Sequence, residues 1–238
     1  MKLPVPPERF TETVRALPGS GYRGANVTIP YKLAALELAD DATPAARAIG
    51  AANTLSFADG GAISADNTDA GGLLAALAGA PAGLRALVLG AGGAARAAVW
   101  ALRDAGASEV LLWNRTGERA ERLAQELGAR AVTAPEPCDL LVNATSVGLD
   151  PGVADAAALA ELGLDGLQPP RIVVDLVYRA SGDPPPVTAW ASRTGARIVD
   201  GIEVLVRQGA LSFERWTGRP APVEAMRAAA RAQFAQHP

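Results

Sequence analysis

Residues 85–106, RALVLGAGGAARAAVWALRDAG, decide the fold of this chain. The aliphatic run at the start is typical of a short buried strand that ends at Gly90, and the Ala-rich segment after it is typical of a helix that stops at Gly106. The next apolar run, EVLLWN at 109–114, predicts a second strand. A strand, a helix and a strand in this order form the repeating unit of a doubly wound parallel sheet.

The same alternation continues towards the C-terminus. A helix is predicted at 118–128, and further strands at 139–145, 171–178 and 197–201. We therefore expect an α/β chain with a Rossmann-type dinucleotide-binding domain at 81–204.

The first part of the chain follows a different pattern. It predicts a helix around 6–17, a short strand at 25–30, a helix at 31–38 and a hairpin around the Gly60-Gly61 pair. The end of the chain is almost entirely helical in pattern. We expect residues 1–80 and 205–238 to form an α/β catalytic and substrate-binding domain, with the C-terminal helices returning to it and a cleft beside the dinucleotide unit.

Composition excludes several classes of protein. The chain has 238 residues, of which 49% are hydrophobic, and its formal net charge of −3 comes without Lys/Arg blocks, which argues against nucleic-acid binding. The longest uncharged stretch, 70–84, is shorter than the roughly 18 apolar residues that a membrane span needs. One Cys and one His make a metal site improbable and fit a reducing compartment. We expect a cytoplasmic protein, monomeric or homodimeric, that acts on a small molecule.

The turn after the first strand predicts a dinucleotide site. Gly90, Gly92 and Ala95 fit the pattern G-x-G-x-x-G/A directly between a strand and a helix. In this pattern Gly90 permits the tight turn, Gly92 leaves room for a pyrophosphate, and the helix start offers free N–H groups. The alternative is that Gly and Ala are simply abundant in this chain.

The end of the second strand favours NADP over NAD. An NAD site places Asp or Glu about 20 residues past the glycine turn, whereas the segment here reads Asn114-Arg115-Thr116. Arg115 and, one helical turn later, Arg119 carry the planar cations that bind a 2′-phosphate. Cations are disfavoured at a helix N-terminus, so a bound anion explains them better than a solvated helix start does.

Two charged residues of the first domain are catalytic candidates. Lys32 ends the segment GANVTIPYK and Asp69 lies in NTDAGG, so that only the fold can bring them together. An amine that exchanges protons near pH 7 needs a carboxylate to orient it or a lowered pKa. Taken alone, without the resemblance described below, the two residues are better explained as an exposed Lys and an exposed Asp.

Seven motifs in one order resemble the shikimate dehydrogenase family across nearly the whole chain. They are GANVTIPYK, NTDAGG, GAGGAARA, NRTGERA, NATSVG, DLVY and QGALSFERWTG. The resemblance implies NADP-dependent, reversible reduction of 3-dehydroshikimate to shikimate, in the pathway to chorismate and the aromatic amino acids. It also implies an N-terminal catalytic domain that faces a Rossmann domain.

The resemblance assigns roles to individual residues. Lys32 and Asp69 match the catalytic pair, with Lys32 as the acid for the ketone oxygen and Asp69 as the group that orients it. The substrate site is implied to contain Thr28, Asn53, Tyr178 and Gln208. The glycine turn and the resemblance together predict cofactor contacts from Gly90, Ala91, Gly92, Gly93, Ala94, Asn114, Arg115, Thr116, Arg119, Asn143, Thr145, Val177 and Gly201.

The chain departs from the family pattern at its start. Family members carry a Ser-x-Ser segment that binds the substrate carboxylate, and the sequence here begins at the helix that follows it. Two alternatives to a shikimate dehydrogenase therefore stay open. One is a related dehydrogenase of quinate or of an amino analogue, and the other is a non-catalytic NADP-binding protein.

Overall fold

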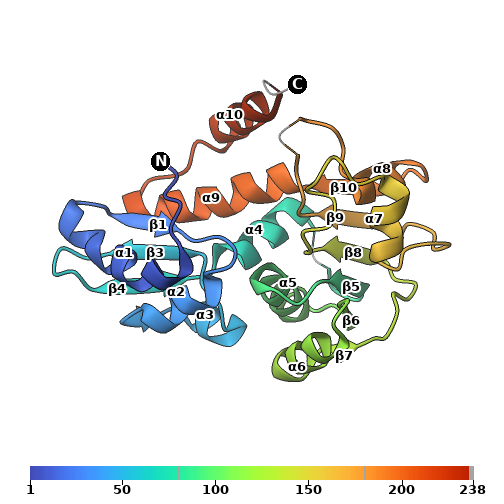
Figure 1. Ribbon diagram of the computed structural model, residues 1–238, viewed down its shortest axis with the longest axis horizontal. Helices are drawn as coiled ribbons and strands as arrows, with labels where there is room; N and C mark the ends of the chain where they lie inside the picture. Colours follow the sequence, from blue (N-terminus) through green and yellow to red (C-terminus); the bar gives the residue numbers. More distant parts are fainter. Residues whose placement is uncertain (80, 180, 236–238) are drawn as a thin grey trace.

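The computed structural model describes residues 1–79, 81–179 and 181–235. They form two lobes, each built on its own sheet (Figure 1). The larger lobe contains six parallel strands in the order β10-β9-β8-β5-β6-β7. These strands are β5 (Arg85–Leu89), β6 (Glu109–Trp113), β7 (Arg130–Ala131), β8 (Leu140–Asn143), β9 (Ile172–Asp175) and β10 (Arg197–Asp200). β5 lies in the middle of the sheet. The chain first adds β6 and β7 on one side of β5 and then adds β8, β9 and β10 on the other, which is the strand order of a doubly wound dinucleotide-binding sheet. The expected fold class is confirmed.

Helices cover both faces of the large sheet, which explains why the middle residues of its central strands are apolar on both sides. The covering helices are α5 (Gly93–Asp104), α6 (Gly117–Leu127), α7 (Asp155–Glu161) and α8 (Pro186–Ser192). Along β5, Ala86 and Val88 pack in one buried cluster with α5 and α6, while Leu87 and Leu89 pack in another with α7 and α8. This packing on both faces fixes the carboxyl ends of the strands, from which the loops of the predicted cofactor site begin.

The smaller lobe contains a four-stranded mixed sheet in the order β1-β3-β4-β2. Its strands are β1 (Gly24–Asn26), β2 (Asp41–Ala42), β3 (Thr54–Phe57) and β4 (Ile63–Asp66), and its helices are η1 (Pro7–Arg9), α1 (Phe10–Ala16), η2 (Pro18–Ser20), α2 (Lys32–Leu38) and α3 (Pro44–Ile49). The antiparallel pair β3 and β4 is the predicted hairpin. The strand predicted at 25–30 is shorter, because the chain turns where Tyr31 N–H donates to the Thr28 carbonyl.

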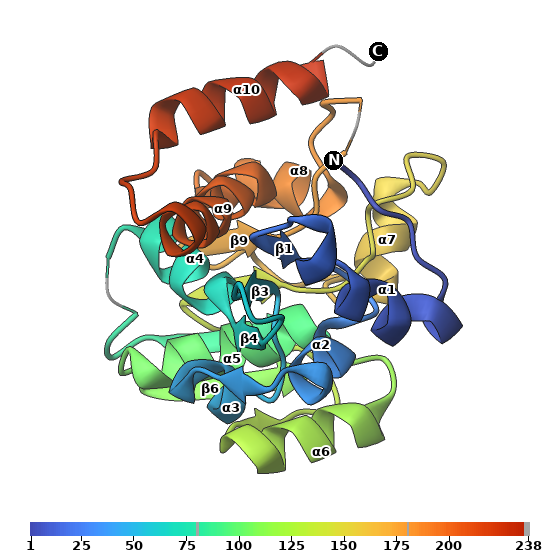
Figure 2. The same ribbon diagram turned by 90° about the vertical axis from the view of Figure 1, so that its left-hand side faces the viewer.

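Two long helices join the lobes. α4 (Thr68–Leu77) follows the small sheet, and α9 (Gly201–Thr217) leaves the large sheet and returns along α4 to the small one (Figure 1). At the far end of α9, Trp216 Nε1 donates to the Leu55 carbonyl oxygen on β3 at 2.9 Å. The last helix, α10 (Val223–Ala235), lies over α9 in Figure 2. This is the expected return of the C-terminal helices, whereas the exact domain boundaries stay a prediction.

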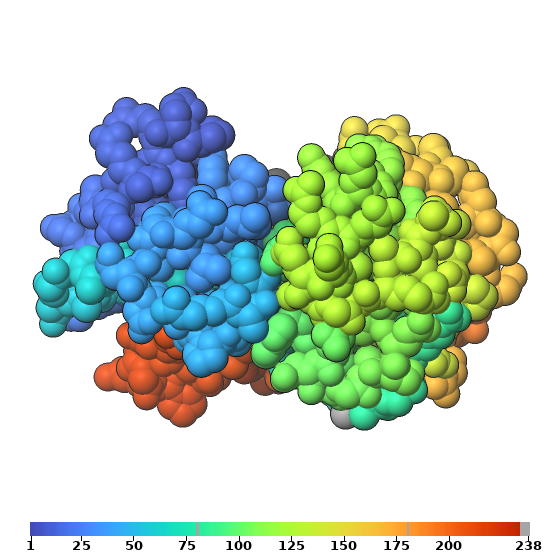
Figure 3. Space-filling view, turned by 90° about the horizontal axis from the view of Figure 1, so that it is seen from below, coloured from blue at the N-terminus to red at the C-terminus, as the bar shows by residue number. Residues whose placement is uncertain are grey.

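The space-filling view shows the two lobes as separate masses that meet at the centre, with an indentation between them (Figure 3). Across the described part of the chain, none of the helices combines the length and the apolar character needed to cross a bilayer.

Candidate active site

Lys32 and Asp69 form an ion pair where the two lobes meet. Lys32 is the first residue of α2 and Asp69 lies in the first turn of α4. The Lys32 Nζ to Asp69 Oδ2 distance is 2.6 Å, although the residues are 37 positions apart in sequence. The two side chains are 12% and 19% exposed, so the pair is shielded from bulk water yet reachable. The predicted pair is therefore assembled by the fold.

Local structure fixes the backbone on both sides of this pair. The Lys32 carbonyl accepts the Ala52 N–H at 2.8 Å, which ties the start of α2 to the segment before β3. Asn67 caps α4 by accepting the Ala70 N–H at 3.3 Å, and this cap places the next acidic residue on the first turn. A carboxylate at a helix N-terminus is itself favoured by the helix dipole.

Asn53 connects the carboxylate to two other elements. Its Nδ2 donates to Asp69 Oδ1 at 2.8 Å and lies 3.0 Å from Gln208 Oε1 on α9. Its Oδ1 accepts the Thr68 N–H at 2.7 Å. Asn53 is only 2% exposed, and its side-chain amide forms hydrogen bonds with other protein groups. The structure thus brings Asn53 to Asp69 as a direct hydrogen-bond partner and Gln208 to Asn53, and the substrate contact of both stays a prediction.

The other two predicted substrate residues come from opposite lobes. Thr28 is exposed in the turn after β1, and Tyr178 is half-buried three residues beyond the end of β9. Burial raises the pKa of the Tyr178 hydroxyl above its ordinary value, which keeps it a hydrogen-bond donor at neutral pH. Their roles stay predictions.

The glycine turn lies against Lys32. Gly90 has a φ of 109°, and a Cβ there would lie 2.9 Å from the Ala144 carbonyl oxygen, so that only glycine fits. A Cβ on Gly92 would meet nothing within 4 Å, which leaves open space at the start of α5. A Cβ on Gly93 would lie 3.0 Å from Lys32 Cδ. The predicted cofactor turn and the ion pair are therefore neighbours, and Ala91 and Ala94 beside them are partly exposed.

A buried carboxylate that the sequence analysis missed organises the loops after β8 and β9. Asp175 Oδ1 accepts Asn143 Nδ2 at 2.9 Å and the Val177 N–H at 3.2 Å, and Oδ2 accepts both donors of Thr188 on α8. Burial raises the pKa of Asp175 to about 6. The signal was available, because Asp175 is the one charged residue inside the aliphatic run IVVDLV.

Asn143 is fully buried, and its amide is used within the protein. Its Oδ1 accepts Thr145 Oγ1 at 2.7 Å, so Asn143 fixes the loop that lies against Gly90. Val177 is buried as well, and a Cβ on Gly201 would lie 2.7 Å from the Leu176 carbonyl oxygen. These residues shape the predicted nicotinamide end of the cleft, and direct contact with a cofactor stays a prediction.

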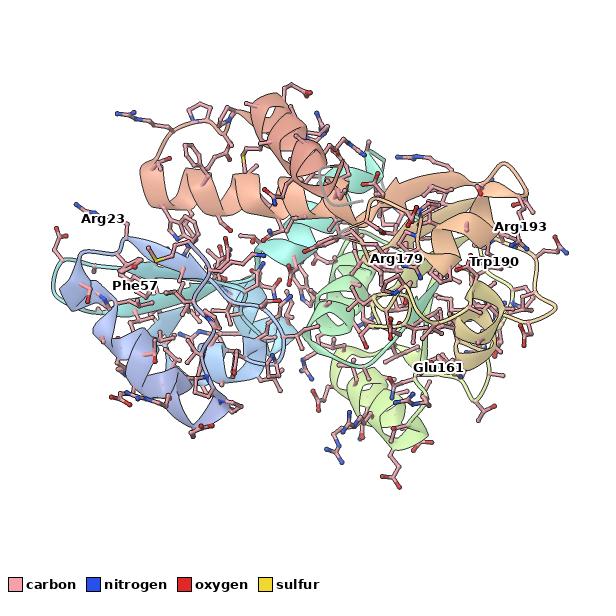
Figure 4. The ribbon with its side chains drawn as sticks, turned by 45° about the horizontal axis from the view of Figure 1, so that its top comes forward. Arg23, Phe57, Glu161, Arg179, Trp190 and Arg193 are labelled. Carbon is pink, nitrogen blue, oxygen red and sulfur yellow. The ribbon has the colours of Figure 1, made fainter. Side chains whose placement is uncertain are left out.

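The predicted 2′-phosphate site lies after β6. Asn114 Nδ2 donates to the Thr116 carbonyl oxygen at 2.9 Å, which shapes the turn into α6. Arg115 is exposed and pairs with Glu161, the last residue of α7, at 2.5 Å, and Arg119 is exposed on α6 (Glu161 is labelled in Figure 4). Sequence reasoning missed Glu161, because 46 residues separate it from Arg115 and no motif joins them.

No cluster of three or more His, Cys, Asp or Glu residues suited to a metal ion occurs within the described ranges. Independence from metals stays a prediction.

Family models match three parts of the chain. Residues 1–55 match the shikimate dehydrogenase substrate-binding domain, residues 74–146 match shikimate/quinate 5-dehydrogenase, and residues 201–231 match the shikimate 5′-dehydrogenase C-terminal domain.

Known proteins resemble the chain over most of its length. Shikimate dehydrogenase (NADP(+)) of Paracoccus denitrificans is 42% identical over 237 residues, which cover 94% of this chain and 82% of that protein. The structure of shikimate 5-dehydrogenase from Thermus thermophilus in complex with NADP(H) and shikimate is 39% identical, with a TM-score of 0.79 over 96% of this chain and 85% of that one. A 5-ketofructose reductase from a Gluconobacter strain is 30% identical, with a TM-score of 0.77 over 97% and 86% of the two chains.

Proposed function

The chain belongs to the shikimate dehydrogenase family, and from that premise we propose that it catalyses the reversible NADPH-dependent reduction of 3-dehydroshikimate to shikimate. The enzyme is an oxidoreductase that acts on a CH–OH group. The observation that carries the proposal is the Lys32–Asp69 ion pair, which lies against the glycine turn at the junction of the lobes. Neither a nucleotide-binding module nor a structural protein needs a partly buried amine at that position.

The residues around the glycine turn fit an NADP molecule. The space beside Gly92 and the N–H groups at the start of α5 suit a pyrophosphate, and the exposed Arg115 and Arg119 suit a 2′-phosphate. We propose that the loops fixed by Asn143 and Asp175 hold the nicotinamide end. When bound, reduced NADP supplies the hydride that adds to the carbonyl carbon of the substrate.

Lys32 supplies the proton. Hydride addition places negative charge on the carbonyl oxygen, and the ammonium of Lys32 stabilises that charge by a hydrogen bond before it transfers a proton to the oxygen. The product is the alcohol. In the oxidative direction the neutral amine of Lys32 takes the proton back from the hydroxyl.

Asp69 positions the amine. One carboxylate oxygen holds Nζ and the other is held by Asn53, so the Lys32 nitrogen keeps one orientation before and after it gives up its proton. Gln208 extends this hydrogen-bond network to α9, a helix that begins on the cofactor lobe.

Absorbance of NADPH tests the proposal directly. The purified protein with NADP⁺ and shikimate is expected to form NADPH. With NAD⁺ in place of NADP⁺ it is expected to form much less reduced cofactor, as NADH, and without substrate it forms none. Absence of turnover with shikimate at any NADP⁺ concentration contradicts the proposal.

A second candidate substrate is quinate, because residues 74–146 match a family that comprises both shikimate and quinate dehydrogenases. Quinate carries an extra ring hydroxyl and lacks the ring double bond of shikimate. The group that is oxidised is a secondary alcohol in both molecules. Comparison of kcat/KM for the two substrates decides between them.

We also propose that the enzyme acts in the cytoplasm, as a monomer or a homodimer, without nucleic-acid or membrane partners. The single cysteine, Cys138, is free, which fits a reducing compartment.

A further inference from the structure

Arg96 lies on α5 of the larger lobe, in the segment GAGGAARA that contains the glycine turn, and its side chain reaches the smaller lobe. Its Nε donates to the Ile49 carbonyl oxygen, at the end of α3, at 2.6 Å. Its Nη2 forms an ion pair with Glu126 Oε2 on α6 at 2.6 Å. The Arg96 side chain is only 16% exposed. This one side chain therefore connects the end of a small-lobe helix to two helices of the larger lobe.

The Ile49 carbonyl needs a donor from outside its own helix. The last carbonyls of a helix have no N–H partner within that helix, and Ile49 is fully buried, so water does not supply one. A cation is a favourable donor at this position because of the helix dipole. α3 lies beside α5 (Figure 1), and Ile49 shares one buried apolar cluster with residues of α5. The glycine pattern of the cofactor turn does not explain this arginine, because a pyrophosphate binds the backbone N–H groups there.

The segment between α3 and β3, which Arg96 holds at its start, contacts both members of the ion pair. The Ala52 N–H donates to the Lys32 carbonyl oxygen at 2.8 Å. The next residue, Asn53, donates from Nδ2 to Asp69 Oδ1 at 2.8 Å. A shift of this segment therefore displaces the amine and the carboxylate together.

Two further contacts strengthen the connection between this segment, α5 and the ion pair. The Ala51 carbonyl oxygen accepts Asn67 Nδ2 at 2.8 Å, and Asn67 caps α4, whose first turn carries Asp69. On α5, a Cβ on Gly93 would lie 3.0 Å from Lys32 Cδ. One helix of the larger lobe thus contacts the stem of the candidate catalytic amine and, one turn later, the segment that holds the backbone of that amine in place.

We propose that Arg96 is a positioning residue for the reaction. It fixes the segment after α3 against the larger lobe, and it thereby holds the Lys32 amine in place relative to the glycine turn. The contacts of Arg96 are with protein groups, so it acts on the reaction through the residues that it holds. The inference rests on the proposed function, because it assumes that Lys32 acts on a substrate beside a bound cofactor.

The competing explanation is that Arg96 serves stability alone. Arg103, two turns further along α5, is the matched control. Its Nη1 donates to the carbonyl oxygen of Leu127, a buried residue at the end of α6 in the same lobe. Methionine replaces either arginine with little change in helix propensity. Arg96→Met and Arg103→Met therefore remove the same type of bond, but only Arg96→Met releases the segment next to the ion pair.

The experiment measures Tm, Kd for NADP⁺, and kcat for shikimate oxidation with both substrates saturating, at a temperature well below both Tm values. Each variant is expected to lower Tm by about 2–10 °C. A catalytic group displaced by about 1 Å can cost about 100-fold in rate, so Arg96→Met is expected to lower kcat by about 10- to 100-fold and Arg103→Met by less than about twofold. Kd for NADP⁺ should stay within about threefold of wild type in both, because the glycine turn binds through backbone groups.

A double variant tests whether Arg96 acts through Lys32. In a Lys32→Met background, Arg96→Met is expected to lower kcat by a further factor of less than about two, because the amine that it positions is already absent.

The lysine variants keep the comparison available should Arg96→Met not fold. An ammonium does not span two partners as a guanidinium does, so Arg96→Lys is expected to have a kcat at least about threefold below that of Arg103→Lys.

Three results overturn the proposal. Equal kcat values for the two methionine variants, or for the two lysine variants, assign Arg96 to stability alone. An undiminished loss of kcat in the Lys32→Met background shows that Arg96 acts on another group. A rise in Kd for NADP⁺ of about tenfold or more with kcat unchanged assigns Arg96 to cofactor binding. A wild-type protein inert towards shikimate is a different outcome, since it refutes the proposed function and the inference with it.

Discussion

Replacing Gly72 by alanine is expected to separate two helices that carry the active site. Gly72 lies where α4 crosses α9, and a Cβ there would lie 2.7 Å from both the backbone N and the Cβ of Gln208. Ordinary contacts begin at 3.4 Å, so the helices must separate by about 0.7 Å or distort. Overpacking of this kind costs about 1–3 kcal/mol, and the better helix propensity of alanine offsets up to about 1 kcal/mol.

The expected net loss is about 1–2 kcal/mol, which lowers Tm by about 2–8 °C in a protein of this size. Because Gln208 moves with α9, its 3.0 Å contact with Asn53 is also strained, and KM for the substrate should rise. Thermal unfolding by circular dichroism and steady-state kinetics measure the two effects.

The neighbouring glycine provides the matched control. A Cβ on Gly71 would meet only Leu211 Cδ1, at 2.8 Å, which is the end of a flexible side chain that is 37% exposed. Gly71→Ala is therefore expected to keep or raise Tm. If the two alanine variants shift Tm equally, or if Gly72→Ala is the more stable protein, the close helix crossing described above is wrong.

Three other predictions concern charge. Arg115→Ala should raise Kd for NADP⁺ by about 10- to 100-fold and change Kd for NAD⁺ little in binding titrations, and equal losses would refute the 2′-phosphate site. Arg227 holds the pKa of Glu203 at about 2, below its usual 4.5, so this group stabilises the fold above about pH 4.5 and the effect is lost as pH falls towards 2. Glu203→Gln should therefore lower Tm at pH 7 by about 3–6 °C, and the gap in Tm between wild type and variant should be smaller at pH 3. A gap in Tm that is the same at both pH values contradicts the lowered pKa of Glu203. Burial raises the pKa of Asp175 to about 6, above its ordinary 3.8, so its contribution to stability is fully present below about pH 4 and is lost as pH rises through 6. Between about pH 4 and pH 7, the free energy of unfolding of wild type relative to Asp175→Asn should fall by up to about 3 kcal/mol. If urea unfolding gives the same difference between the two proteins at every pH, Asp175 does not titrate in this range.

The sequence predicts the large lobe well because its strands are long, apolar and separated by amphipathic helices. The limits arise where tertiary contacts override the local pattern. The run at 171–178 reads as one strand, yet β9 ends at Asp175, because that carboxylate accepts the Val177 N–H and turns the chain. The two-residue strands β2 and β7 have no pattern of their own and exist through pairing with β4 and β6.

The candidate site was predictable in its residue types but not in its contacts. Family resemblance pointed to Lys32, Asp69 and Asn53, and the structure shows that the Asn53 amide is engaged with Asp69 inside the protein. Glu161 and Asp175 act on the predicted cofactor residues through contacts between distant loops. Such contacts are set by the packing of several elements, so no local sequence pattern encodes them.

The central claim is that Lys32 exchanges a proton with the substrate oxygen. Lys32→Met keeps the aliphatic stem that packs on Gly93 and removes only the amine. With both substrates saturating, kcat for shikimate oxidation is expected to fall by about 10²-fold or more, while Kd for NADP⁺ stays near the wild-type value. A variant that turns over at the wild-type rate would contradict the mechanism.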